Sequence, residues 1–230
     1  FIFVEKIDLG KNKLKRFLEM KDLPHVIEPE TYDLKEDISL KGNWNKKFFK
    51  NDNPIVLELG CGKGEYSVAL AERFPEKNFI GVDIKGNRMW VGAKGSIEKG
   101  MKNIAFLRIR IENIMKCFAK NEISEIWITF PDPQIKQKRQ SKRLTHPNFL
   151  KKYNQFLKKD STIHLKTDSA FLYGYTLGII QVESHDLLDC TNDLYNVHQI
   201  RENIDIKTHY EKIYLEKGTP ITYTKFRLRY

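Results

Sequence analysis

The sequence predicts an α/β fold, a doubly wound parallel sheet of seven strands. Three observations support this prediction. Apolar segments typical of buried strands alternate along the chain with segments of helical periodicity. The first such pair, at residues 54–66, is joined by a glycine-dense turn, which is typical of the start of a nucleotide-binding βαβ unit. The length of 230 residues fits one large α/β domain.

Seven segments have the composition of strands, because they are apolar, rich in β-branched residues or alternating in polarity. They are residues 55–59, 78–82, 104–109, 125–130, 161–165, 185–190 and 221–229. Apolar residues at helical spacing, or helix-start signals, predict helices within residues 43–51, 66–74, 87–99, 149–157, 171–182 and 208–218. We therefore expect strands and helices to alternate through the chain.

The chain before the glycine-rich turn is more polar. Residues 6–21 are largely basic and polar, with an apolar spacing that allows a short amphipathic helix. Residues 23–31 contain two prolines and should run extended over the surface. Trp44 favours a further helix packed on the sheet. We expect residues 1–50 to be an N-terminal basic extension and helix packed on the core of a domain at residues 51–230.

The composition narrows the class of partner. A net charge of +10 at pH 7 and an isoelectric point near 9.3 favour a polyanionic partner. The three cysteines are scattered without CxxC or Cys/His spacing, so we expect a reducing compartment and no metal site. No apolar segment approaches the roughly 18 residues of a membrane span. We expect a cytoplasmic protein that binds no membrane.

The turn after the first strand carries glycines at alternate positions. The missing Cβ atoms of Gly60, Gly62 and Gly64 allow positive φ angles and let a ligand approach the backbone. A dinucleotide fingerprint is excluded because Glu65 stands where its third glycine belongs. A Walker motif is excluded because Lys63 is followed by neither Ser nor Thr. The turn completes no pyrophosphate cradle, so neighbouring side chains must identify the ligand.

Two acids accompany this turn. Glu58 lies in the apolar strand, and because a buried lone acid is costly it should face an ammonium group or backbone donors. Asp83 ends the second strand, nineteen residues beyond Gly64, the usual place for an acid that binds a ribose diol. Acids and glycines together suit S-adenosylmethionine, which combines an amino acid end, a sulfonium and a ribose. A generic α/β turn with an acid at the strand end is the alternative.

The predicted strand at residues 125–130 leads directly into Pro131, Asp132 and Pro133. In open α/β sheets chemistry takes place beyond the carboxyl ends of the strands. The prolines restrict φ and remove backbone donors, which holds Asp132 in a rigid turn, as a positioned catalytic carboxylate requires. An Asp in an ordinary proline turn is the alternative.

A basic segment follows this turn. Residues 136–159 contain nine Lys and Arg residues and neither Asp nor Glu. Like charges this close repel one another unless an anion relieves them, and phosphate is the obvious anion. A solvated basic loop is the alternative.

Two further groups of residues have more than one interpretation. The strand at residues 161–165 ends in a Lys-Thr-Asp sequence that should meet the proline turn at one cleft. Its Asp168 can accept from a base edge, hold Lys166 or cap the following helix. Thr208 and Glu211 have the spacing of a capping box, so they can serve only to begin a helix.

Several motifs together resemble the bacterial tRNA (guanine-N7-)-methyltransferase (TrmB) family over about residues 11–228. They are LELGCGKGEY, ITFPDPQ with the basic run and KRLTHPNFLKKY after it, IHLKTD, and THYE followed by GTPI. The resemblance implies a class I S-adenosylmethionine-dependent methyltransferase fold, Rossmann-like and doubly wound. It also implies S-adenosylmethionine as methyl donor and a guanine in the tRNA variable loop as acceptor.

The resemblance implies roles for individual residues. The expected cofactor contacts are Glu58, Gly60, Gly62, Gly64, Asp83, Arg110, Glu112 and Asp132. Asp132 is also the expected active-site acid. The expected contacts to tRNA or its guanine are Lys136, Lys138, Arg139, Lys142, Arg143, Asp168, Thr208, Tyr210 and Glu211.

The chain departs from the family pattern in two places. Gln134 and Ile135 replace the usual Trp and Pro after the PDP sequence, so an aromatic platform is lost. Arg110, with Glu112 two residues further on, stands where the family usually has Asp or Asn, which puts the adenosine contact there in doubt.

Two other functions remain open from the sequence. One is a class I methyltransferase acting on another RNA site or an exocyclic amine, although the turn at residues 131–134 lacks the N/D-P-P-aromatic pattern of amino methylases. The other is a non-catalytic tRNA-binding protein or a subunit that needs a partner, against which the intact Glu58 and Asp83 argue. Monomer and homodimer are both compatible with the sequence.

Overall fold

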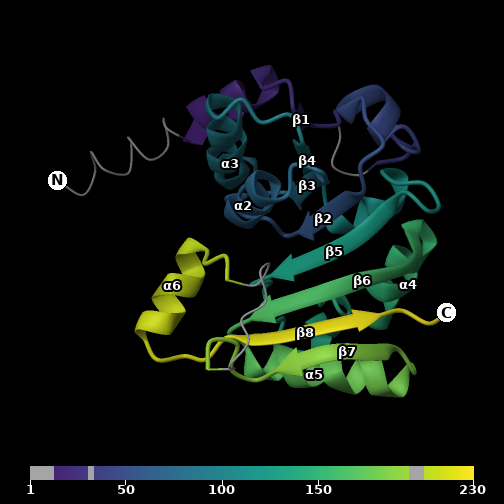
Figure 1. Cartoon of the computed structure of the whole chain (residues 1–230), viewed down its shortest axis with the longest axis vertical. Helices are drawn as coiled ribbons and strands as arrows, with labels where there is room; N and C mark the ends of the chain where they lie inside the picture. Colours follow the sequence, from purple (N-terminus) through teal and green to yellow (C-terminus); the bar gives the residue numbers. More distant parts are fainter. Residues whose placement is uncertain (1–12, 31–33, 197–204) are drawn as a thin grey trace.

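The computed structural model describes residues 13–30, 34–196 and 205–230, which form an eight-stranded sheet with helices on both faces (Figure 1). The strands lie in the order β1-β4-β3-β2-β5-β6-β8-β7. Their bounds are β1 Val26–Ile27, β2 Ile55–Leu59, β3 Asn78–Asp83, β4 Ile104–Arg108, β5 Ile123–Thr129, β6 Leu157–Thr167, β7 Asp186–Thr191 and β8 Thr222–Arg227. Strands β1 to β6 run parallel, and β8 runs antiparallel to both its neighbours.

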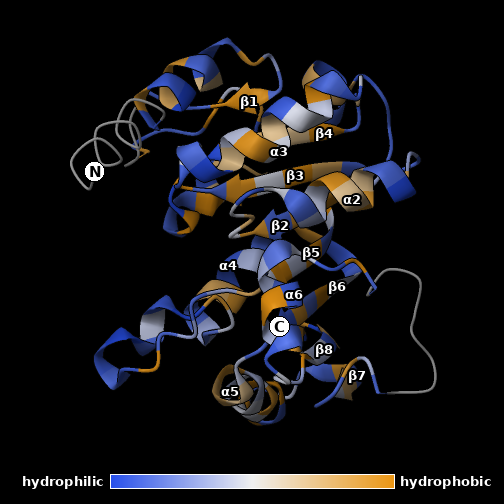
Figure 2. Cartoon of the chain, turned by 90° about the vertical axis from the view of Figure 1, so that its left-hand side faces the viewer, coloured by the Kyte–Doolittle hydropathy of each residue, from blue (hydrophilic) through white to orange (hydrophobic). Residues whose placement is uncertain are grey.

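The helices separate into two layers. The α-helices are α2 Glu65–Arg73, α3 Gly86–Glu98, α4 Pro147–Phe156, α5 Ala170–Val182 and α6 His209–Glu216, and the shorter helices are η1 Trp44–Phe49, η2 Ile111–Lys116 and η3 Gln137–Lys142. Residues of α2 and α3 pack in one hydrophobic cluster, and residues of α4, α5 and η1 pack in another. Figure 2 shows α5 as an apolar helix along the lower part of the sheet. The sheet is thus doubly wound, as predicted.

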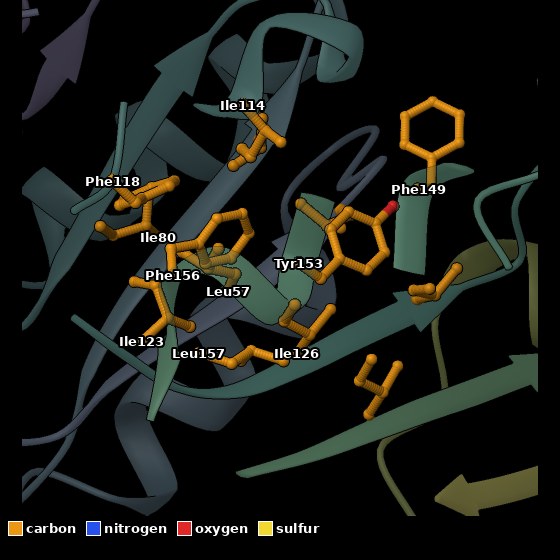
Figure 3. Packing of buried hydrophobic residues seen from close by; sticks show 14 of the residues in the cluster. Leu57, Ile80, Ile114, Phe118, Ile123, Ile126, Phe149, Tyr153, Phe156 and Leu157 are labelled. Atoms are coloured by element: carbon orange, nitrogen blue, oxygen red, sulfur yellow. The ribbon is translucent and has the colours of Figure 1, made fainter. Parts of the chain in front are cut away.

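Alternation along the central strands divides the core between these layers. Leu57 of β2 and Ile126 of β5 point toward α4, and Figure 3 shows them packed with Tyr153 and other residues of the cluster. Val56 and Trp127, their neighbours in sequence, belong to the cluster on the α2 side. Successive strand residues face opposite sides of a sheet, so strands covered on both faces are apolar throughout.

The sheet has one strand more than predicted. Residues 26–27, within the segment expected to run extended over the surface, pair in parallel with Phe106 and Leu107 of β4. The segment is therefore extended, and it also adds β1 as an edge strand. Two apolar residues between prolines are too short to indicate a strand in the sequence.

The last strand also departs from a purely parallel sheet. β7 ends at the carboxyl edge of the sheet, and the chain then forms α6 at that same edge before entering β8 (Figure 1). Because α6 lies at this edge, β8 starts at the edge where β7 stopped and runs antiparallel to it.

The N-terminal region contributes to both layers. Residues 13–22 are helical, while residues 1–12 of the expected basic extension lie outside the described residues. The helix expected around Trp44 is η1, a π-helix whose Trp44 side chain is fully buried. The Trp44 indole donates to the Cys117 carbonyl at 2.9 Å and stacks on Phe118.

Two expectations from composition concern cysteines and membrane spans. All three cysteines are described, and each is a free thiol. Over the described ranges, no helix combines the length and apolarity that a bilayer crossing requires.

Candidate active site

A cavity of about 500 Å³ opens at the carboxyl edge of the sheet, beside the ends of β2, β3 and β5. Its lining includes Glu58, Gly60, Gly62, Asp83, Asp132, Arg139, Lys142, Thr208 and Tyr210 from the residues expected in the site. These residues come from segments far apart in the sequence, and they meet because parallel strands end at one edge. The volume lies within the roughly 300–1,000 Å³ of small-ligand sites.

The glycine turn forms one wall of this cavity. Gly60, Gly62 and Gly64 have φ angles of 80°, 55° and 73°, in the left-handed region that favours glycine. Gly62 has open space where a Cβ atom would lie, so a ligand can approach its backbone. A Cβ atom on Gly64 would instead lie 2.6 Å from the Phe106 ring. Gly64 is therefore required for packing under the turn and does not line the cavity.

Asp83 connects this turn to the end of β3. Its Oδ2 atom accepts the N–H of Gly62 at 2.9 Å, and its Oδ1 atom accepts the N–H of Lys85 at 2.8 Å. A carboxylate offers about four acceptor positions, so these two bonds orient Asp83 and leave it able to accept ligand hydroxyl groups.

Glu58 lies at the base of the cavity and is nearly inaccessible to solvent. Its Oε2 atom accepts the backbone N–H of Ser67 at 2.9 Å and the Ser67 hydroxyl at 2.5 Å, and its Oε1 atom accepts the Thr129 hydroxyl at 2.5 Å. The expected backbone donor is confirmed. Burial raises the pKa of Glu58 to about 7, against the opposing effect of these hydrogen bonds.

The turn after β5 places Asp132 on the exposed side of the cavity. Its Oδ1 atom accepts the N–H of Gln134 at 3.0 Å. Phe130 and Gln134, on either side of the Pro-Asp-Pro sequence, have φ angles of 47° and 48°. Non-glycine residues in this region cost about 1–3 kcal/mol each and are concentrated at functional sites. The prolines predict a rigid turn, but no sequence signal predicts these two positive φ angles.

The basic segment divides into side chains that reach the cavity and side chains that do not. Arg139 and Lys142 of η3 line it. Lys136 and Lys138 are exposed beside them. All four remain available to a large anionic ligand that covers the mouth of the cavity.

Arg143 differs from the rest of the basic segment because it is buried. Its guanidinium donates to the Gln134 carbonyl at 3.3 and 3.2 Å. It also stacks over the rings of Phe171 and Tyr175. The side chain thus braces the Pro-Asp-Pro turn against α5, and a direct contact to tRNA stays a prediction.

The end of β4 contributes a different residue from those expected. Arg110 and Glu112 are exposed and lie outside the cavity lining, whereas Ile111 between them lines it. Ile84, which follows Asp83, also lines the cavity. Two apolar side chains form a wall suited to a flat heterocycle.

Sequence reasoning missed several other lining residues. They include Cys61, Lys63, Lys85, Arg88, Thr129 and Leu144. Cys61, Lys63 and Leu144 each adjoin a predicted site residue, so their position next to that residue was the available signal. Spacing alone could not decide which neighbour points inward.

At the end of β6, Asp168 neither caps the following helix nor holds Lys166, two of the three roles considered for it. Ser169, and not Asp168, caps α5, because its hydroxyl accepts the N–H of Leu172. Lys166 pairs with Glu211 at 2.8 Å, so Asp168 does not hold it. Asp168 is half-buried and hydrogen-bonds Tyr214; burial raises its pKa.

The capping box at the start of α6 is confirmed. The Thr208 hydroxyl accepts the N–H of Glu211 at 3.3 Å, and the Glu211 carboxylate accepts the N–H of Thr208 at 3.2 Å. Thr208 and Tyr210 line the cavity, but the Glu211 side chain is fully buried behind them.

A second cavity, of about 470 Å³, lies at the other end of β6. Four of its charged side chains form two ion pairs, since Arg227 contacts Asp160 at 3.3 Å and Arg229 contacts Asp186 at 2.6 Å. The catalytic candidates all lie at the opposite edge of the sheet. Among the described residues, no group of three or more His, Cys, Asp or Glu side chains is arranged to hold a metal ion.

The residues present fit S-adenosylmethionine. Asp83 has acceptor capacity beside the open backbone of Gly62, where ribose hydroxyls would bind. Ile84 and Ile111 offer the apolar wall that an adenine ring requires, and Glu58 supplies a carboxylate at the base. The cavity therefore offers the kinds of groups that this cofactor requires.

Comparison with solved structures supports the fold. The chain superimposes on a 16S rRNA methyltransferase, KamB, with a TM-score of 0.62 and 13% identity over 85% of this chain and 96% of that one. It superimposes on an antibiotic-related methyltransferase with a TM-score of 0.60 and 17% identity over 85% and 97%. Identities this low establish the α/β methyltransferase fold alone.

Comparison with the sequences of known proteins is more specific than comparison of folds. Residues 52–224 match the family model described as "Putative methyltransferase". The tRNA (guanine-N(7)-)-methyltransferase of Christiangramia forsetii is 54% identical over 96% of this chain and 99% of its own length. The enzyme of the same name from Bacteroides thetaiotaomicron is 50% identical over 96% and 87%. The fold, the S-adenosylmethionine cavity and these relatives lead to one conclusion: the chain belongs to the tRNA (guanine-N7-)-methyltransferase family.

Proposed function

We propose that this protein transfers the methyl group of S-adenosylmethionine to N7 of a guanine in the variable loop of tRNA. The observation that carries the proposal is that one cavity joins the cofactor side, with Asp83, to the Pro-Asp-Pro turn, with Asp132. Arg139 and Lys142 stand at the same cavity, where an RNA backbone can be held. The named relatives support tRNA as the acceptor.

Methyl transfer to guanine N7 requires little acid or base catalysis from the protein. The cofactor supplies an activated methyl group on a sulfonium. Guanine N7 carries a lone pair and no proton, so in-line displacement requires no general base. Catalysis then comes mainly from alignment of the two reactants, an effect that can supply about 7–11 kcal/mol.

Asp132 is the residue we assign to the acceptor side. Positive charge develops on the purine as the methyl group is transferred, and a fixed carboxylate stabilises that charge. The hydrogen bond from the Gln134 N–H and the flanking prolines hold the carboxylate in place before the base arrives. The target guanine must leave its stack to reach the cavity.

The remaining roles follow from position. We assign Glu58, Gly60, Gly62 and Asp83 to the cofactor, and Thr208 and Tyr210 to the guanine side, because all of them line the cavity. We assign Lys136, Lys138, Arg139 and Lys142 to tRNA phosphates. Gly64 and Arg143 act through the packing described above.

We further propose that the enzyme acts in the cytoplasm, where its tRNA substrate is matured, as a monomer or a homodimer. Light scattering coupled to size-exclusion chromatography distinguishes the two assemblies.

The function is tested by incubating the protein with labelled S-adenosylmethionine and unmodified bulk tRNA. Borohydride and aniline treatment then cleaves RNA chains at N7-methylguanine. A single cut in the variable loop is the expected result. Methylation without cleavage would indicate another RNA methyltransferase, and tRNA binding without methylation would indicate a binding protein or a missing partner.

A further inference from the structure

A buried ion pair lies beneath α6. Lys166 stands at the carboxyl end of β6 and Glu211 in the first turn of α6, with Nζ and Oε1 2.8 Å apart. Neither side chain has exposed surface. Figure 1 shows α6 beside the tips of β5 and β6, so this pair joins the helix to the sheet next to the candidate site.

Further hydrogen bonds enclose this pair. Lys166 Nζ also donates to the Ile206 carbonyl at 2.8 Å and to the Tyr195 hydroxyl at 3.2 Å. The Tyr195 hydroxyl donates to Glu211 Oε1 at 2.5 Å, and Glu211 Oε2 accepts the N–H of Thr208. Both oxygens of Glu211 are therefore engaged within the chain, and neither faces the cavity.

The first turn of α6 is also held from its other side. The N–H of His209 donates to Glu65 Oε2 at 2.8 Å, and Glu65 belongs to the first turn of α2. Later in α6, the Tyr214 ring stacks on Phe130, which directly follows β5. The helix is thus fixed at β6, α2 and the turn after β5, which places Thr208 and Tyr210 on the cavity wall.

We propose that Lys166 and Glu211 form a positioning pair, which sets α6 so that Thr208 and Tyr210 meet the target guanine. Glu211 acts through this pair and does not contact tRNA. The inference rests on the proposed function, and it gives Glu211 a role different from the substrate contact that the family resemblance implies. Lys166 becomes a residue required for recognition of tRNA although it is inaccessible to it.

The energetics of buried pairs suggest a discriminating experiment. Removal of one partner leaves an uncompensated buried charge and displaces the structure around it, whereas removal of both charges is often neutral. Lys166→Met alone should therefore shift α6. Adding Glu211→Gln removes the second charge and keeps a capping-box residue, whose amide oxygen can accept the N–H of Thr208 while its amide N–H donates to the Tyr195 hydroxyl.

Steady-state tRNA methylation and calorimetric binding of S-adenosylmethionine are measured for wild type, for K166M and for K166M/E211Q. For K166M we expect kcat/KM for tRNA to fall about tenfold or more, while the cofactor Kd stays within about threefold of wild type. The double variant should recover kcat/KM to within about threefold of wild type. K99M/E72Q, the same pair of substitutions at an exposed ion pair, is the matched control and should equal wild type.

Whether kcat/KM recovers in K166M/E211Q decides whether Lys166 and Glu211 act as a positioning pair. If the double variant is folded, binds cofactor normally and still methylates as poorly as K166M, Glu211 acts on tRNA directly and the inference is wrong. Wild-type kinetics in K166M would also overturn it. Should K166M not fold, the double variant against wild type gives the decision by the same criterion. A wild-type protein inactive on tRNA would instead overturn the proposed function itself.

Discussion

Asp132 lies on the exposed side of the cavity, where its Oδ1 atom accepts the N–H of Gln134. Glu58 lies at the base of the same cavity and accepts from Ser67 and Thr129. The first carboxylate can meet an incoming base, and the second is held by the protein. The two carboxylates therefore differ in exposure, which fits the proposed roles of Asp132 toward the acceptor and Glu58 toward the cofactor.

Asp132→Ala is expected to lower kcat by about a hundredfold or more, because the carboxylate that stabilises the purine cation is lost. The melting temperature should not change, since the side chain is exposed. Single-turnover methylation and thermal unfolding measure the two effects. Asp52→Ala, at an exposed acid before the start of β2, is the matched control, and near-normal turnover in Asp132→Ala would remove Asp132 from the mechanism.

Glu58→Gln is expected to stabilise the cofactor-free protein at pH 8. The pKa of Glu58 rises from 4.5 to about 7 on folding, so the folded state holds its proton more tightly and loses stability as the pH rises between these values. The gain of the variant over wild type should be negligible below pH 4.5 and reach at most about 3 kcal/mol above pH 7.

Urea unfolding of both proteins across this pH range measures the difference. His164, whose pKa is lowered to about 4 by burial, contributes in the opposite direction in both proteins and cancels. A difference independent of pH would show that Glu58 does not carry the expected burial cost.

At the level of elements, η3 and α6 frame the mouth of the cavity. η3 presents a largely exposed basic surface, whereas α6 is fixed by a buried pair. In the proposed function the two elements serve different parts of tRNA recognition: η3 would provide charge for phosphates and α6 would provide shape for the base.

The triple variant of Lys136, Lys138 and Lys142 to Met tests the charge of this segment. Each phosphate contact contributes about 0.7 to 0.9 to the salt slope, so the variant should lower the slope of log K for tRNA against log[salt] by about 2 to 3. Filter binding at several salt concentrations gives the slope. A triple variant of the exposed Lys46, Lys47 and Lys120 to Met, far from the cavity, should keep it, and equal slopes in both variants would place tRNA elsewhere.

The sequence pattern predicted α6 but neither the position of α6 in the fold nor the short helix η3. The capping box of Thr208 and Glu211 is a local signal, so the helix it begins was predicted. Its location depends on Lys166, which lies 45 residues earlier in the chain, and spacing holds no information on that contact. The direction of β8 likewise depends on where α6 lies.

On the scale of the whole molecule, the central sheet followed from periodicity, and the position of Glu58 and Asp83 at one cavity followed from where their strands end. Their contacts with the cofactor stay a prediction. The cavity lining was predicted less well, because Ile111 lines the cavity whereas Arg110 and Glu112 are exposed outside its lining. Polar residues are the usual candidates for a binding site in a sequence, but a cavity wall that packs on an adenine ring requires apolar residues. The N-terminal region also proved more integrated than its polar composition indicates, since Trp44 is buried in the main core.

We propose that residues 1–50 are an extension docked on a domain of residues 51–230, and Trp44 tests the docking. Trp44→Ala should lower the free energy of unfolding by about 3–5 kcal/mol, because a fully buried indole is replaced by a cavity. Trp44→Phe, which keeps most of the ring packing, should cost less. Urea unfolding measures both, and a change below about 1 kcal/mol in Trp44→Ala would mean that this region contributes little to stability.

The central claim is that guanine N7 accepts the methyl group. The most direct measurement uses a tRNA that carries 7-deazaguanosine at the variable-loop position mapped by aniline cleavage, where a C–H group replaces the N7 lone pair. We expect this tRNA to bind as tightly as its guanosine counterpart in competition experiments and to incorporate no methyl group. Methylation of the 7-deaza tRNA at a rate close to that of the guanosine tRNA would contradict the account.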